Sequence, residues 1–156
     1  MNVALPIRAE KPSGRPAELI DAWRGRCLNH YSRAEGAVGK ALEACEPDGP
    51  SISLAGKRAE RLADLLGSKA EFTDKQRRAF LSSLSALKRF SEKRGFLAHG
   101  IATILYDGDK RWHLWLEANR HHWVICGEDI DSFESELKKT CVDACSRLGQ
   151  IIPLAT

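Results

Sequence analysis

Apolar residues recur every three or four positions through the first third of the chain, which is the spacing of one face of an α-helix. This pattern predicts a long helix that begins near Pro16 and ends at Glu46–Pro50, a segment rich in helix-stopping proline and glycine. Proline is tolerated in a first helical turn, and Glu18 lies favourably near the positive end of the helix dipole. The predicted apolar face consists of Leu19, Trp23, Cys27, Tyr31, Ala34, Val38, Ala41 and Cys45.

Two further helical patterns follow, one over Leu54–Leu66 and one from Thr73 to about Ala98. Gly67 ends the first. Thr73 is predicted to begin the second as its N-cap, with Gln76 three residues later completing a capping box. The apolar side of the first comprises Leu54, Ala55, Leu62, Leu65 and Leu66. The stripe of the second comprises Phe80, Leu84, Leu87, Phe90 and Leu97, and includes Ser91 and Arg94.

The period changes to two after Gly100, which indicates β-strands. Strands are predicted over Ile101–Tyr106, Arg111–Glu117 and His122–Cys126, separated by turn-forming residues. Asp131 with Glu134 resembles a second capping box, which opens a last helix to about Gln150. The stripe of that helix is Phe133, Leu137, Cys141, Ala144 and Leu148. The predicted fold is therefore mainly α: an antiparallel bundle of about four helices with a small antiparallel β meander inserted before the last helix.

Residues 1–16 contain three prolines and are predicted to form an irregular arm, whereas residues 17–156 are predicted to form a single domain. A net charge of +3 permits an anionic partner such as RNA but does not demand one. We expect no membrane span, because no segment approaches the roughly 20 apolar residues that one requires. Five irregularly spaced cysteines and no export-signal pattern favour reduced thiols and a cytoplasmic protein.

Arg94 and His99 form the polar pair that attracts most interest. Arg94 lies on the apolar stripe, where an arginine without a partner would cost several kcal/mol. His99 is expected at the helix end, just before Gly100, a residue suited to a left-handed C-cap. Arg24 and His30 have a similar spacing, but Arg24 lies off the main stripe of its helix. Context therefore favours Arg94 and His99 as the candidate site.

The segment Arg94-Gly95-Phe96-Leu97-Ala98-His99-Gly100 resembles the signature of the HEPN superfamily, an arginine followed after four to six residues by histidine, often within Ala-His-Gly. The resemblance implies a small helical-bundle domain and a metal-independent endoribonuclease, with Arg94 on the scissile phosphate and His99 exchanging a proton with the 2′-hydroxyl or the leaving oxygen. It further implies a homodimer, RNA as substrate, a cyclic phosphate product, and a toxin or phage-defence role with a neutralising protein partner.

The alternative is a non-catalytic HEPN-like module that dimerises or binds nucleotide or RNA. Gly95 favours it, because active members usually carry a polar residue, often asparagine, after the arginine. Ile101 replaces the tyrosine that one toxin subgroup has two residues past the histidine. Purely structural roles also remain open: an ion pair of Arg94 with Glu35 or Glu43, and a helix-capping role for His99.

A zinc site is the remaining chemical candidate, because His113, His121 and His122 precede Cys126, and Cys141 and Cys145 lie four residues apart. Neither set has a paired Cys-x-x-Cys arrangement, so we predict no metal and no other cofactor. Trp112, Trp115 and Trp123 are interpreted as sheet core rather than as a base-stacking platform. Trp115 lies on the face opposite Trp112, where it is open to solvent exposure.

Overall fold

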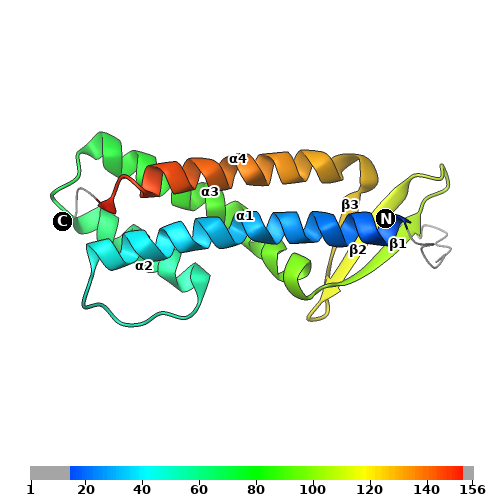
Figure 1. Ribbon diagram of the computed structural model, residues 1–156, viewed down its shortest axis with the longest axis horizontal. Coiled ribbons are helices and arrows are strands. Elements are labelled where there is room, and N and C mark those ends of the chain that lie inside the picture. Colours follow the sequence, from blue (N-terminus) through cyan, green and yellow to red (C-terminus); the bar gives the residue numbers. More distant parts are fainter. Residues whose placement is uncertain (1–14, 153–156) are drawn as a thin grey trace, which may run out of the picture. The chain divides into compact units, whose positions relative to one another are not determined.

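The computed structural model describes residues 15–152 of the protein, which form four α-helices and three β-strands (Figure 1). The mainly α fold, with its antiparallel meander before the last helix, is confirmed. The elements are α1 (Arg15–Cys45), α2 (Ala55–Ser68), α3 (Asp74–His99), β1 (Ile101–Tyr106), β2 (Trp112–Ala118), β3 (His121–Cys126), the short 3-10 turn η1 (Gly127–Asp129) and α4 (Ile130–Leu148).

The predicted arm, residues 1–16, lies outside the described residues except for its last two. Arg15 and Pro16 belong to the first turn of α1, so the helix begins slightly earlier than predicted. The reason is that proline fixes a helical φ and lacks only an N–H that the first turn leaves unpaired anyway.

The chain divides into two compact units, and α1, α3 and α4 each contribute residues to both. The first unit contains the described residues up to Leu28 together with Glu92–Glu136. The second contains Asn29–Ser91 and the described residues from Leu137 onward. The strands and the Arg94–His99 segment both belong to the first unit.

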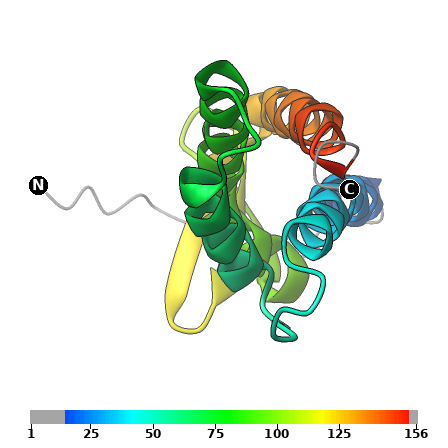
Figure 2. The same ribbon diagram turned by 90° about the vertical axis from the view of Figure 1, so that its left-hand side faces the viewer.

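The second unit is a helical assembly, seen end-on in Figure 2, in which segments of all four helices contribute to one core. Within it α3 runs opposite to α1 and α4 (Figure 1). The Tyr31 hydroxyl donates a hydrogen bond of 2.6 Å to the Phe90 carbonyl, so the polar tip of this buried ring has a partner. The core comprises Val38, Ala41, Leu42, Cys45, Leu62, Leu66, Phe72, Phe80, Leu84, Leu148 and Ile151.

The predicted apolar faces are confirmed at most positions and wrong at three. Leu19 is 71% exposed, and Ile20 is buried one turn before Trp23 in its place. Leu54 is 66% exposed because it precedes α2 as its N-cap. Ser91 is also exposed. Spacing alone cannot choose between positions three and four residues from a buried neighbour, because both lie on its side of a helix.

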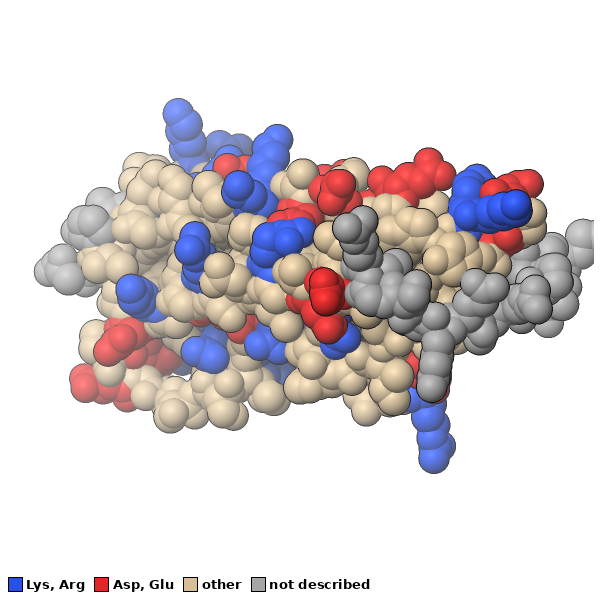
Figure 3. Space-filling view, turned by 45° about the vertical axis from the view of Figure 1, so that its right-hand side comes forward, with Lys and Arg blue, Asp and Glu red and all other residues tan. Residues whose placement is uncertain are grey.

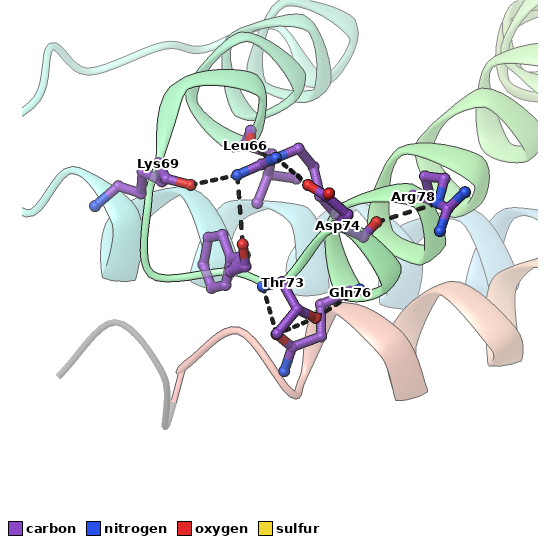
Figure 4. Close-up of polar contacts among 8 residues, drawn as sticks. Leu66, Lys69, Thr73, Asp74, Gln76 and Arg78 are labelled. Carbon is purple, nitrogen blue, oxygen red and sulfur yellow. Dashed lines mark hydrogen bonds and ion pairs between the residues drawn. The ribbon is translucent and has the colours of Figure 1, made fainter.

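The connection between α2 and α3 contains the predicted capping box (Figure 4). Thr73 Oγ1 accepts from the Gln76 amide at 3.2 Å, and Gln76 Oε1 accepts from the Thr73 amide at 2.9 Å. Arg77 adds three hydrogen bonds to the carbonyls of Leu66, Lys69 and Phe72. The bond to Leu66 satisfies a carbonyl that the end of α2 leaves without an intrahelical partner, and the other two satisfy carbonyls of the connection.

The first unit has its own core between the sheet and the adjoining helix ends. Alternation along the paired strands buries Ile104, Leu114, Leu116 and Ile125 on one face. Aromatic rings extend this core: the centroid of Trp123 lies 6.4 Å from that of Trp23, 5.0 Å from that of Phe133 and 6.4 Å from that of Phe96. Trp123 is partly buried and packs at the edge of this core, on the face where the prediction placed it.

The second predicted capping box is wrong. The turn η1 leads directly into α4, so Asp131 already lies inside the helix rather than at its N-cap. The Glu134 carboxylate instead accepts two hydrogen bonds from Arg26 of α1, at 2.8 and 2.9 Å. The local pattern predicted that Glu134 would cap the start of the helix, but its carboxylate binds the distant Arg26 instead.

Candidate functional site

Arg94 and His99 lie on the last two turns of α3 and differ in exposure. Arg94 is partly buried, whereas His99, the final helical residue, is exposed. Five residues along an α-helix correspond to a rise of about 7.5 Å and a rotation of about 140°. The two side chains therefore leave the helix on different sides, which accounts for the difference in exposure.

The turn that carries His99 is held by an arginine from α1. Arg24 Nε donates to the Leu97 carbonyl at 2.9 Å, and its Nη2 donates to the Gly100 carbonyl at 3.0 Å. The last carbonyls of a helix have no intrahelical donor, so this pair of bonds, here called the Arg24 bridge, satisfies groups that would otherwise need water. Arg24 shared the spacing pattern with His30, and its role in the fold is to fix the end of α3.

Gly100 is required at the helix end for a reason that its sequence context did not reveal. It does not adopt the predicted left-handed conformation. Its amide donates to the Phe96 carbonyl at 2.8 Å, and an added Cβ would lie 2.3 Å from the same oxygen and 3.4 Å from the Leu116 Cβ. Close approach to the Phe96 carbonyl of α3, rather than a positive φ, disfavours a side chain here.

Gly95 has the opposite environment. It is exposed, and an added Cβ would meet nothing within 4 Å. The glycine therefore does not serve a close approach, and it weakens the helix by about 1 kcal/mol relative to alanine. The position next to Arg94 is free to accept a larger side chain.

Exchanging each glycine for alanine separates these two roles. We expect Gly95→Ala to raise the free energy of unfolding by about 0.5–1 kcal/mol, because alanine restricts the unfolded chain and favours the helix. We expect Gly100→Ala to lower it by about 1–3 kcal/mol, because the backbone must move to admit the methyl group. Urea unfolding followed by circular dichroism measures both; equal effects of the two substitutions would contradict the assigned roles.

Strand register places two more histidines at the end of the sheet where α3 meets β1. Ile101, the first residue of β1, pairs with Glu117, which pairs with His122, and Ala118 pairs with His121. The β2–β3 turn at Asn119 and Arg120 is therefore at the same end of the sheet as Ile101, which follows His99 by two residues. Sequence spacing treated His121 and His122 only as metal candidates, because their position depends on hairpin register.

Trp115 and His122 form a stacked pair on the face of the sheet opposite the core. Their ring centroids are 4.2 Å apart and the rings are within 8° of parallel. Trp115 is partly buried and His122 exposed. The register confirms that Trp115 lies on the face opposite Trp112, and its interpretation as sheet core is wrong, because the buried Leu114 and Leu116 lie on the other face.

The histidines and cysteines do not assemble into a metal site in the part of the chain that the structure describes. Within residues 15–152 no group of three or more His, Cys, Asp or Glu side chains is arranged to hold a metal ion. His113 and Cys126 pair at one sheet end, and His121 and His122 lie at the other. Burial raises the pKa of Cys141 to about 12 and also raises that of Cys145, which disfavours the thiolate that a metal would need.

The turn between β1 and β2 is organised by the carboxylate of Asp107. It accepts hydrogen bonds from the backbone amides of Asp109 and Arg111 and from Arg111 Nε, and its Oδ2 lies 3.1 Å from His113 Nε2. The His113 contact, followed by the backbone amides and the Arg111 charge, lowers the pKa of Asp107 to about 2. His113 therefore has a structural partner remote from His99.

Because the pKa of Asp107 is lowered, the stability of the turn decreases at acid pH. Because the folded-state pKa is below the ordinary value, the contribution is present above about pH 4. It is lost as the pH falls through about 2. We expect Asp107→Asn to lower the melting temperature at pH 7. The difference in melting temperature between the native protein and the variant should be smaller at pH 2, where the Asp107 contribution is lost. Parallel melting curves for the two proteins across pH 2–7 would contradict the assignment.

No protein-family model matches the sequence, and no curated protein or solved structure matches it either. The resemblance to HEPN proteins therefore rests on the Arg94–Gly100 segment and on the helical architecture. Among the described helices, none has the length and apolar character needed to cross a bilayer.

Proposed function

We propose that this protein is a metal-independent RNA endonuclease of the HEPN type, in which Arg94 and His99 act at the scissile phosphodiester. The observation that carries the proposal is the position of His99: an exposed imidazole on a helix end that is fixed by the Arg24 bridge. It follows a partly buried arginine by five residues. A proton-transferring group must be both accessible and held in place, and His99 meets both conditions.

The chemistry is an internal transesterification. A ribose 2′-hydroxyl gives up its proton as its oxygen attacks the adjacent phosphorus, and the bond from phosphorus to the 5′ oxygen breaks. The products are a 2′,3′-cyclic phosphate and a 5′-hydroxyl. Imidazole is suited to exchange the proton, because histidine titrates near neutral pH. The planar guanidinium of Arg94 suits the phosphate oxygens, on which negative charge develops in the transition state.

The proposal includes a homodimer. Because Arg94 and His99 leave one helix about 140° apart, a second copy facing the first would supply the complementary group on each side of the phosphate. Light scattering at tens of micromolar should give twice the 17.3 kDa chain mass. A monomer mass would remove the dimer from the proposal. A toxin or defence role with a neutralising protein partner follows from the resemblance alone.

A second candidate, a non-catalytic nucleotide- or RNA-binding module, is favoured by the solvent-exposed glycine at position 95. Active relatives within the superfamily usually have a polar side chain there. Since the position has room for one, Gly95→Asn can be made without crowding. If the motif lacks only that side chain, Gly95→Asn should cleave RNA. If the motif is not catalytic, the variant should remain inactive.

The decisive experiment is cleavage of a mixed-sequence RNA by the purified chain, with and without EDTA. We expect native protein to cleave RNA but not DNA of equal sequence, and EDTA to have no effect. His99→Ala should lower the rate by about 10²–10⁴-fold, the usual contribution of a general acid or base. Arg94→Ala should also abolish cleavage. His30→Ala is the matched control, because His30 belongs to the other arginine–histidine spacing, and it should cleave at the native rate.

Three results would count against the endonuclease. Full cleavage by a folded His99→Ala protein would remove His99 from the mechanism, and loss of cleavage in EDTA would indicate a metal enzyme. If neither the native protein nor Gly95→Asn cleaves any RNA, the binding module becomes the better description.

A further inference from the structure

The face of the protein seen in Figure 3 has no continuous basic surface that would attract RNA by itself. On the face seen in Figure 3, lysine and arginine side chains are interspersed with aspartate and glutamate. The net charge of the chain is only +3. Nucleic-acid binding without a basic surface must depend on a few local contacts, because phosphate attraction supplies most non-specific affinity.

The outer face of the sheet, opposite the core, offers such contacts. Directly paired positions put Ile101, Glu117 and His122 in one row, and Trp115 with Val124 in the next. Ile101 is 75% exposed and Val124 43% exposed, so among the described residues this apolar surface is open. The Trp115–His122 stack lies within it, and its imidazole is exposed.

We propose that this outer face binds an unpaired base of the RNA, which extends the Trp115–His122 stack beside the His99 end of α3. Bases stack on aromatic side chains without regard to sequence, and only a base outside a duplex can do so. The inference rests on the proposed function for its cleavage consequences. It identifies the substrate class as RNA that is single-stranded next to the cleavage site.

The turn beside the stack supplies the cationic contact. Arg120 is exposed and adopts φ 65°, and Asn119 before it adopts φ 52°. Two successive positive φ values define a tight hairpin turn whose second position normally favours glycine. An arginine there carries a conformational cost, and it directly precedes His121 and His122 in the chain. Glu117 faces the solvent in the same row as His122, so the phosphates are expected on the Arg120 side.

Register connects this surface to the candidate catalytic residue. Ile101 is two residues after His99 and is the direct neighbour of Glu117, which is the neighbour of His122. Neighbouring strands are about 4.8 Å apart, so the row from Ile101 to His122 spans about 10 Å. The stack therefore lies at the end of the sheet where β1 follows His99.

The test measures binding apart from cleavage. The probe is a fluorescent single-stranded oligonucleotide with 2′-O-methyl groups, which cannot undergo internal transesterification. Anisotropy gives its Kd for native protein, His122→Ala, Trp115→Phe and the control Val142→Ala, which removes an exposed apolar side chain from α4. We expect His122→Ala to weaken binding about 5- to 100-fold. Trp115→Phe should stay within about threefold of native, because phenylalanine keeps an aromatic ring.

Cleavage of ordinary RNA is then measured with the same proteins. His122→Ala should raise KM with kcat within about threefold of native, because the stack binds the base but does not touch the reacting atoms. Native protein that binds the probe but cleaves nothing would refute the endonuclease and leave the base-binding surface standing. Native protein that cleaves RNA, with His122→Ala indistinguishable from it in Kd and KM, would refute the surface and leave the endonuclease standing.

Three other outcomes overturn the inference. The first is equal affinity for the single strand and the same sequence as a duplex. The second is no binding of the probe by native protein. The third is a change of oligomeric mass in His122→Ala, which would identify the outer face as a contact between two copies of the chain. Melting curves for each variant establish that the protein compared is folded.

Discussion

The arrangement of the first unit depends on how the end of α3 is fixed. A helix ends with carbonyls that have no donors in the helix, and here Arg24 donates to one of them, that of Leu97, and to the carbonyl of Gly100, which lies between α3 and β1. Hydrogen bonds to a charged donor are about twice as strong as neutral ones, and these are partly buried. The Arg24 bridge thus defines where the helix stops and from which point the sheet begins.

Several features follow from that fixed end. Gly100 approaches the Phe96 carbonyl so closely that a side chain would force the backbone to move, and β1 starts at the next residue. The register of β1 with β2, and of β2 with β3, then brings the Asn119–Arg120 turn to the end of the sheet near His99. In the last two turns of α3, Lys93 Nζ lies 5.2 Å from the centroid of the Trp123 ring, and the centroid of the Phe96 ring lies 6.4 Å from it. These side chains connect the end of the helix to β3.

The sequence predicted those features that depend on near neighbours. The apolar spacing of α1 from Trp23 to Cys45, the capping box of Thr73 and Gln76, and the meander after Gly100 each arise from residues within a few positions of one another. The candidate pair was found in the same way, as a local arginine–histidine spacing. The geometry of the helix end that carries this pair could not be predicted locally. Arg24, which donates to the Leu97 carbonyl there, is 73 residues from Leu97 in the chain. Glu134 shows the same limit, since a distant arginine engages the side chain that the local pattern assigned to a cap.

The most direct test of this description is native-state amide hydrogen exchange in Arg24→Met, with Arg26→Met as the matched control. Methionine keeps much of the aliphatic volume of arginine but donates no hydrogen bond, and Arg26 forms an exposed pair with Glu134 that should contribute little. We predict that Arg24→Met speeds exchange of the amides from Leu97 to Ile101 by at least about tenfold. Amides of the second unit's core, such as those of Val38 and Leu42, should keep their protection, and Arg26→Met should match the native protein. Unchanged exchange at Gly100 in Arg24→Met would show that the end of α3 does not depend on the Arg24 bridge.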